Sequence, residues 1–217
     1  MSTRLGRLLA ERSYDASIRP GMAAARSTGA CSGTGSILPR AEPDQVHVQF
    51  VITRVHSIST NAKSYGIDGY FRIQWTDPRL RFDTSSELCN EPEPLLWDLN
   101  RDGKVWLPDL YFEDSTKDII GEASGQYLGS LMHIYRNGSL MWSQRARLEF
   151  KCPMDVTDMP WDTQCCPFRV GLYSQQADTV VLAWKAEEQA MLHWQGKSTS
   201  EWTVTNVLSR STLMEFA

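Results

Sequence analysis

Hydrophobic and polar side chains alternate with a period of two in several segments, a pattern typical of half-buried β-strands. In the segment 46–52, apolar residues alternate with His47, Gln49 and Val51. The same alternation runs through 70–75, where the positions expected to face a core are Phe71, Ile73 and Trp75. The residues between them are then expected to share the opposite face of the strand.

The clearest hairpin joins 131–135 to 140–150 through the dipeptide Asn137-Gly138. Asn-Gly supplies the positive φ angles that a type I′ turn requires. Three later strands are expected at 168–173, 179–184 and 201–208, and a last one at 212–216. Short strands separated by turn signals indicate an all-β protein.

Helical spacing appears only near the start of the chain. Leu5, Leu8 and Leu9 are spaced as on one face of a helix, and Pro20 is expected to stop any helix that precedes it. The stretch that follows is rich in Ala, Gly, Ser, Thr and Pro, which indicates a long surface loop.

These patterns predict a single domain over 1–217. Its parts are a helix at 3–13, an inserted loop at 21–45 and strands over 46–217, the last of them truncated. The predicted fold class is all-β, an immunoglobulin-like antiparallel β-sandwich of about ten strands with an N-terminal α-helix.

Composition and charge exclude two broad classes of protein. The 22 Lys and Arg against 26 Asp and Glu give a formal net charge of -4, which offers no basic field for nucleic acid. No apolar run approaches the roughly 20 residues of a membrane helix, so the chain as given is not expected to span a membrane. The N-terminus lacks the uninterrupted apolar stretch of a secretory signal.

Candidate chemistry is sparse. The histidines are scattered, and no nucleophile with a base or phosphate loop emerges, so neither enzymatic activity nor a cofactor is expected. No Cys-x-x-Cys pair or nearby histidine accompanies the five cysteines, so disulfides are favoured over a metal site. Asn137 begins an Asn-Gly-Ser sequence that could accept N-linked glycan or simply form the hairpin turn.

The most specific motif lies between Cys152 and Cys166, where thirteen residues include Pro160, Asp162 and Gln164. Other motifs follow a fixed order along the chain: Tyr14-Asp15 with Arg19-Pro20, the run Tyr70 to Leu80, Trp106-x-Pro108-Asp109, and Arg136-Asn-Gly138 with Ser143-Gln-Arg145. Together they resemble the Cys-loop receptors, the pentameric ligand-gated ion channels, and most closely the branch gated by GABA, glycine and glutamate. An invertebrate-type or orphan member is expected. Met159 stands where the family usually has an aromatic residue.

The resemblance implies an extracellular ligand-binding domain of a neurotransmitter receptor, held at the outer face of the plasma membrane and arranged as one of five copies in a ring. It implies a small ligand, an amine, amino acid or amphiphile, bound between neighbouring subunits. The chain ends at Ala217, near where the first membrane helix of such a receptor is expected. The alternatives are a soluble ligand-binding relative, similar to the acetylcholine-binding proteins, and an adhesion-type β-sandwich.

The resemblance also implies how the cysteines pair. Cys152 and Cys166 would form the disulfide that closes the loop of the family, and Cys165 would be left as a buried free thiol. Cys31 and Cys89 fall in regions that the family places far from the membrane, so a second disulfide between them is expected to tie down the inserted loop.

On the complementary side of the subunit interface, the resemblance places two strand faces. Arg72 matches an arginine that binds a ligand carboxylate, and a guanidinium suits that role because its planar fork can form two parallel bonds. The residues assigned to this side are Tyr70, Arg72, Met141, Ser143 and Arg145.

On the principal side, Tyr173 matches an aromatic residue that faces a ligand ammonium. Glu113 could bind a cation, repel an acid or be an exposed loop carboxylate. The last segment has neither an adjacent cysteine pair nor an aromatic lid, which argues against a nicotinic-type site. The residues assigned to this side are Phe112, Glu113, Tyr173, Ser174, Leu208 and Arg210.

The resemblance further implies how a bound ligand would act. Closure of the segment 208–211 on the ligand would favour one of two states of the ring. The response would reach the pore through the loop 152–166, mainly 155–162, and through the turn around Asn61.

Overall fold

The computed structural model describes residues 14–27, 42–82, 93–99, 104–120, 130–185, 191–192, 202–205, 207–208 and 210. The expected helix 3–13, the strand 212–216 and the cysteines Cys31 and Cys89 lie outside these residues. The elements are α2 (Pro20–Ser27), β1 (Asp44–Ser59), β2 (Ser64–Thr76), the 3-10 turn η1 (Pro78–Leu80), β3 (Leu95–Trp97), β4 (Leu110–Glu113), β5 (Ser115–Ile120), β6 (Ser130–Ile134), β7 (Ser139–Lys151), β8 (Arg169–Leu172), β9 (Val180–Trp184) and β10 (Met191–Leu192).

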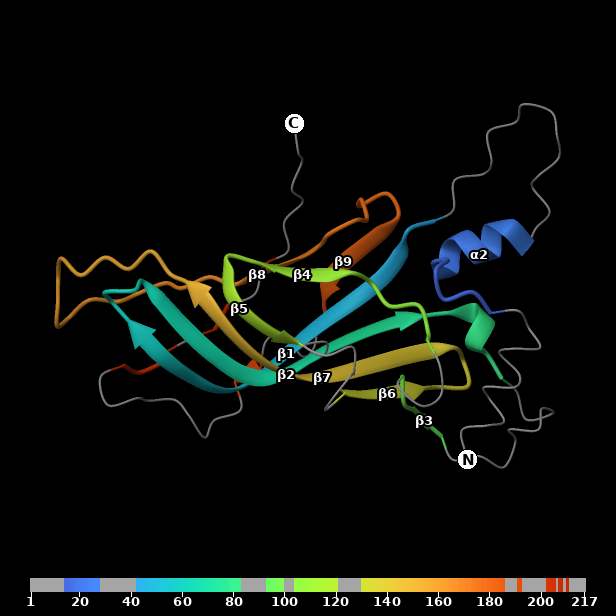
Figure 1. Cartoon of the computed structure of the whole chain (residues 1–217), viewed down its shortest axis with the longest axis horizontal. Coiled ribbons are helices and arrows are strands. Elements are labelled where there is room, and N and C mark those ends of the chain that lie inside the picture. The colour runs from blue at the N-terminus through green and yellow to red at the C-terminus, as the bar shows by residue number, and fades with distance from the viewer. Residues whose placement is uncertain are drawn as a thin grey trace.

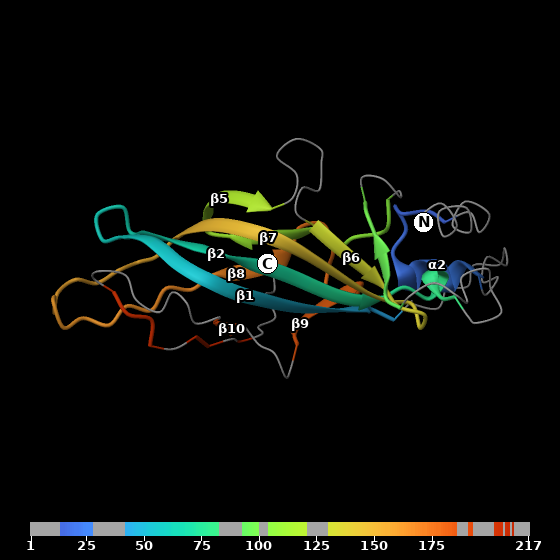
Figure 2. The same cartoon turned by 90° about the horizontal axis from the view of Figure 1, so that it is seen from below.

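Eight strands form one large sheet, and β4 and β8 form a small second sheet. Three long antiparallel strands, β1, β2 and β7, make up the middle of the large sheet, while β9 and β10 pair with β1 in parallel. The cartoon is elongated, with α2 and the loop after β7 at opposite ends of its long axis (Figures 1 and 2). The all-β sandwich expected from the sequence is confirmed, with these two parallel pairings as exceptions to its antiparallel order.

The core lies between the two sheets because one face of each long strand is apolar. Phe71, Ile73 and Trp75 are all buried, as the alternation along 70–75 predicted. The ring centroid of Phe112 on β4 lies 5.2 Å from that of Phe71 and 6.0 Å from that of Phe150. The small sheet therefore covers the inner face of the large one, and the polar residues of β2 and β7, apart from the buried Gln144, point away from it.

The chain before the sandwich is held by a buried carboxylate. Asp77 is fully buried, accepts a hydrogen bond from the Tyr14 hydroxyl at 2.9 Å and forms an ion pair with Arg79 at 2.7 Å. Burial is the main reason that the pKa of Tyr14 is raised, so its hydroxyl stays protonated and donates to Asp77. The Tyr14-Asp15 motif is thus tied to the motif that follows Trp75.

Three local predictions are wrong, and the first concerns the segment after Pro20. We expected a loop from residue 21, but Pro20–Ser27 form helix α2. Proline fits the first helical turn, where its missing N–H is not needed. The next free amide, that of Gly21, donates to Asp44 Oδ1 at 2.8 Å, so a side chain from β1 caps the helix. Asp44 also forms an ion pair with Arg19 at 2.7 Å.

The hairpin between β6 and β7 is confirmed, but its turn is not type I′. Within this turn, Gly138 has a positive φ of 82° and Asn137 does not, whereas a type I′ turn requires a positive φ at both. The Gly138 amide donates to the Tyr135 carbonyl and the Tyr135 amide to the Ser139 carbonyl, both at 2.9 Å. This is a three-residue loop, a type I turn followed by a glycine bulge.

The strand expected at 201–208 is also not found in the described part of that segment. Thr203 forms only an isolated bridge there, and neighbouring residues have no strand assignment. The strands expected at 168–173 and 179–184 are confirmed as β8 and β9.

Candidate functional site

The outward face of the large sheet is ordered into rows by strand register. Arg72 lies opposite Gln49 on β1 and Ser143 on β7, and Tyr70 lies opposite Arg145. One step toward α2, Gln74 lies opposite Met141. The five residues expected on the complementary side therefore do share one sheet face, spread over three successive rows.

Arg72 is the central residue of this face. Its side chain is partly buried, and its Nε has no hydrogen-bond partner among the described residues. Tyr70 is exposed on one side of it, and Ser143 is partly buried beside it. A buried guanidinium N–H without a partner costs free energy, so this site favours an acceptor that approaches from outside.

Toward the other end of the same face, Asp68 gathers two arginines. Its carboxylate accepts hydrogen bonds from Arg54 Nε at 3.1 Å and from Arg147 Nε at 3.0 Å. Burial opposes ionisation, but the bonds from both arginines outweigh it, so the pKa of Asp68 lies below its usual value. The charges of Arg54 and Arg147 are thereby partly neutralised by Asp68. Within the described chain, no carboxylate pairs with Arg72 in this way.

Four of the six principal-side residues, Phe112, Glu113, Tyr173 and Ser174, lie on the small sheet and the loop that follows β8. Tyr173 is 83% exposed, and its ring centroid lies 6.1 Å from that of Tyr111 in an edge-to-face arrangement. The Asp109 carbonyl accepts from the Tyr173 amide at 3.0 Å, and its Oδ2 accepts from the Ser174 amide at 2.8 Å. The Trp-x-Pro-Asp motif therefore fixes the loop that carries Tyr173.

Phe112 is a correction. It was expected at the ligand site, but it is buried in the core against Phe71 and Phe150. Tyr111, its neighbour on β4, points to the other face instead and was missed. Strict alternation along β4 could have identified Tyr111, since only one of two adjacent residues in a strand can face the core.

Three further principal-side residues, Glu113, Leu208 and Arg210, have surroundings of their own. Glu113 Oε2 lies 3.9 Å from Arg169 Nη1, so a cation on the same sheet already accompanies this carboxylate. Leu208 is exposed, and the Arg210 carbonyl accepts from the Trp184 indole at 3.1 Å. Within the described part of the chain, no hydrogen bond, ion pair or ring contact joins Leu208 or Arg210 to Tyr173.

The loop after β7 contains the predicted disulfide between Cys152 and Cys166, which is confirmed. Gln164 braces the loop: its Oε1 accepts from the Asp155 amide at 3.0 Å and its Nε2 donates to Asp162 Oδ2 at 2.7 Å. Cys165 is a free thiol as expected, but it is exposed rather than buried, because side chains of adjacent residues in extended chain point to opposite sides.

The tip of this loop is apolar and exposed. Trp161 is 89% exposed, and Val156 and Met159 are exposed beside it in sequence. An exposed group of large apolar side chains usually marks a surface that contacts another protein or a membrane. No helix in the described residues is long and apolar enough to cross a membrane, and those residues hold no cluster of metal-ligating side chains.

Comparisons with known proteins agree with these features. Residues 35–215 match the model of the neurotransmitter-gated ion-channel ligand binding domain. The glutamate-gated chloride channel of Drosophila melanogaster is 30% identical over 186 residues, which are 83% of this chain and 35% of that protein. The gamma-aminobutyric acid receptor alpha-like protein of the same species is 26% identical over 176 residues, 81% of this chain and 22% of that protein.

A human relative, gamma-aminobutyric acid receptor subunit alpha-3, is 28% identical over 140 residues, 64% of this chain and 27% of the relative. The chain thus spans only about a quarter to a third of the length of these relatives. All three are receptors or channels rather than enzymes by name. The chain belongs to the neurotransmitter-gated ion-channel ligand-binding domain family, the Cys-loop receptors, in their GABA- and glutamate-gated branch.

Proposed function

We propose that this domain binds a small zwitterionic ligand, of the amino-acid class, between two adjacent subunits of a ring. The principal side is the pair Tyr111 and Tyr173, and the complementary side is centred on Arg72. The domain is extracellular, and binding is transmitted to a pore through the loop 152–166.

The observation that carries this proposal is the placement of the two half-sites on opposite faces of one sandwich. Tyr111 and Tyr173 belong to the small sheet and its following loop. Arg72 lies on the face of the large sheet that points away from the small sheet, because its neighbours Phe71 and Ile73 fill the core. One chain cannot bring these groups together, so a site that contains both needs two chains.

The chemistry of the two halves supports the ligand class. An aromatic pair at the surface attracts an ammonium group by on the order of 1–2 kcal/mol when water is excluded. A guanidinium with an unpaired N–H suits a carboxylate. γ-Aminobutyrate and glutamate, the ligands that the names of the relatives mention, carry both groups.

The loop 152–166 supports the coupling step. The Cys152 amide donates to the Lys63 carbonyl at 2.7 Å, so the loop is joined to the turn that contains Asn61. Its exposed Trp161 suits contact with an apolar surface. An exposed tryptophan at the tip of this loop fits a receptor better than a freely soluble ligand-binding protein, because a soluble protein has less reason to expose tryptophan.

The test is titration of the purified domain with γ-aminobutyrate, glutamate and small amines, followed by thermal unfolding, since a bound ligand raises stability by mass action. Arg72→Ala should abolish the response to acidic ligands. Arg72→Lys should weaken that response roughly tenfold, because lysine keeps the positive charge but lacks the planar guanidinium that forms two parallel hydrogen bonds. Tyr173→Phe should retain the response and Tyr173→Ala should lose it.

The matched control is Lys151→Ala, which removes a positive charge from the far end of β7. It should leave ligand responses unchanged. A ligand response that survives both Arg72→Ala and Tyr173→Ala would place the site elsewhere.

A further inference from the structure

The turn between β6 and β7 carries a motif that the proposed function does not use. Asn137-Gly138-Ser139 has the form Asn-x-Ser with a residue other than proline in the middle, which is the acceptor sequence for N-linked glycan. No other asparagine of the chain has Ser or Thr two positions later; the others are Asn61, Asn90, Asn100 and Asn206. The chain therefore offers a single acceptor asparagine.

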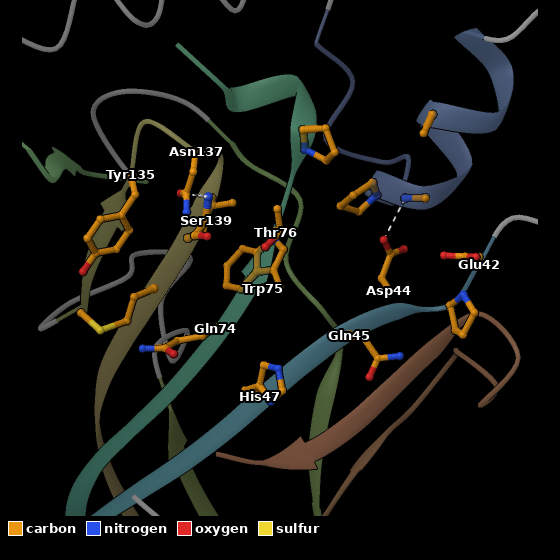
Figure 3. Close-up of a pocket in the computed structure, with 17 residues that line it drawn as sticks. Glu42, Asp44, Gln45, His47, Gln74, Trp75, Thr76, Tyr135, Asn137 and Ser139 are labelled. Atoms are coloured by element: carbon orange, nitrogen blue, oxygen red, sulfur yellow. Dashed lines mark hydrogen bonds between the residues drawn. The ribbon is translucent and has the colours of Figure 1, made fainter. Parts of the chain in front are cut away.

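The side-chain amide of Asn137 can carry a sugar in the folded domain. Asn137 is exposed, and its Oδ1 accepts a hydrogen bond from the Ser139 amide at 2.9 Å (Figure 3). Its Nδ2, the atom that bears the sugar, makes no hydrogen bond within the described residues, and neither does the Ser139 hydroxyl that the acceptor sequence requires. The turn thus uses the oxygen of the amide and leaves the nitrogen available.

The surrounding structure holds the turn through its backbone. The Asn137 carbonyl accepts from Arg81 Nε at 3.0 Å, and the Gly138 carbonyl accepts from the Asp77 amide at 2.8 Å. Neither contact involves the side chain of Asn137. A substituent on Nδ2 would therefore leave the contacts that fix the hairpin intact.

There is also room for a sugar beside this turn. Asn137 and Ser139 line one end of a cavity of about 920 Å³ next to helix α2 (Figure 3). Gln74 and Thr76 of the adjacent strand β2 line the same cavity. Their amide and hydroxyl groups can donate to and accept from the hydroxyls of a sugar.

The position of the turn keeps a bulky substituent clear of the surfaces proposed to function. Ser139 lies four residues before Ser143, the partner of Arg72, which is about 14 Å along β7. The loop 152–166 follows the other end of β7, whose 13 residues extend for about 40 Å. A glycan at the turn therefore lies away from both the Arg72 row and the loop proposed to reach the pore.

We propose that Asn137 carries an N-linked glycan that begins with N-acetylglucosamine. The proposal rests on the extracellular location proposed above, because the donor, a lipid-linked oligosaccharide, meets chains that enter the secretory route. Asn137 Nδ2 forms a bond to C1 of the first sugar and loses one proton. The bond from C1 to the lipid pyrophosphate breaks, and the pyrophosphate leaves with the electron pair.

The test is secretion of the 217-residue chain from insect cells behind an added signal peptide, followed by peptide N-glycosidase in water enriched in the heavy oxygen isotope. The enzyme should increase the mobility of the protein on a gel in one step. It should leave aspartate with heavy oxygen at position 137, which mass spectrometry detects. The isotope separates this product from spontaneous deamidation of Asn-Gly, which takes place earlier, in ordinary water.

Variants of the acceptor sequence identify the modified atom. Asn137→Gln and Ser139→Ala should both abolish the mobility change, and Ser139→Thr should retain it. Lys63→Ser is the positive control, because it creates a second acceptor sequence at Asn61 on the exposed turn between β1 and β2 and should add a second step. Secreted protein with unmodified Asn137 overturns the proposal, as does a mobility change that survives Asn137→Gln.

The readouts separate this proposal from the proposed ligand site. Asn137→Gln should keep the thermal response to acidic ligands, because the turn is remote from the Arg72 row. Arg72→Ala should lose that response and keep the glycan. A secreted domain that responds to acidic ligands but lacks the glycan overturns only the glycan proposal, and a glycosylated domain without a ligand response overturns only the ligand site.

Discussion

Adjacent residues on β4 have opposite surroundings, and this decides which of them can meet a ligand. Phe112 packs on the rings of two other strands, while Tyr111 lies beside Tyr173 on the outer face. The close approach of the Tyr111 ring depends on Gly171 across the ladder. A Cβ at that glycine would lie 3.0 Å from Tyr111 Cε1.

Truncating these two neighbours should separate stability from binding. Phe112→Ala should lower the free energy of unfolding by about 3–5 kcal/mol, because a large core ring leaves a cavity. Tyr111→Ala should cost much less stability, since its ring is only partly buried, yet weaken amine binding. Urea unfolding of both variants checks this, and equal losses of stability would contradict the assigned orientation of β4.

Asp68 should make the stability of the domain depend on pH in the acidic range. Its pKa is lowered in the folded state, so its contribution is present above the unfolded value near 4 and is lost as the pH falls through the folded value. Asp68→Asn should cost about 1–2 kcal/mol at pH 7, and less as the pH drops below about 4. Urea unfolding across this range measures the difference between the two proteins, which would stay constant if Asp68 were not ionised in the fold.

At the scale of elements, the β6–β7 hairpin depends on one backbone conformation. Gly138 has φ of 82°, and a Cβ there would lie 2.7 Å from the Asp77 carbonyl oxygen. The turn is thereby packed against the η1 segment that anchors the N-terminal part of the sandwich. The dipeptide alone did not reveal this contact.

Gly138→Ala should lower the free energy of unfolding by about 2 kcal/mol, since the left-handed conformation alone costs about 1–2 kcal/mol and the clash adds to it. Asn137→Ala is the matched control in the same turn. It loses the bond from the Ser139 amide to Asn137 Oδ1 and should cost only about 0.5–1 kcal/mol. Thermal unfolding of both variants distinguishes them, and equal costs would argue against the tight glycine contact.

Local alternation was enough to predict the long strands and which faces of β2 and β7 are polar. It could not predict α2, because that helix begins at a proline and is capped by Asp44, a residue far along the chain. The Asp44 cap is a long-range contact that leaves no local signal. Phe112 is a different case, because the resemblance placed it at the ligand site, whereas rings of β2 and β7 hold it in the core and alternation along β4 already allowed only one of Tyr111 and Phe112 to face outward.

At the scale of the whole molecule, the disulfide holds one end of the sandwich. Cys152 is buried and its partner Cys166 is followed by Pro167, whose carbonyl accepts from the Tyr65 hydroxyl at 2.9 Å. Burial is the main cause of the raised pKa of Tyr65, so this donor stays protonated. The loop is therefore fixed to β2 by a covalent and a polar link.

Cys166→Ala should lower the free energy of unfolding by about 3 kcal/mol, as expected for opening a loop of this length. Cys165→Ala changes the adjacent exposed cysteine and should leave stability within about 0.5 kcal/mol. Denaturation under non-reducing conditions compares them. A comparable loss in both would indicate that the two cysteines exchange roles.

The opposite placement of Tyr173 and Arg72 also has a genetic consequence. If each subunit contributes one half to each of two different sites, a subunit with Arg72→Ala still offers an intact Tyr173, and one with Tyr173→Ala still offers an intact Arg72. Co-expression of two inactive alleles would then restore some complete sites in mixed rings. Rings made only of subunits that carry both Arg72→Ala and Tyr173→Ala would contain no complete site.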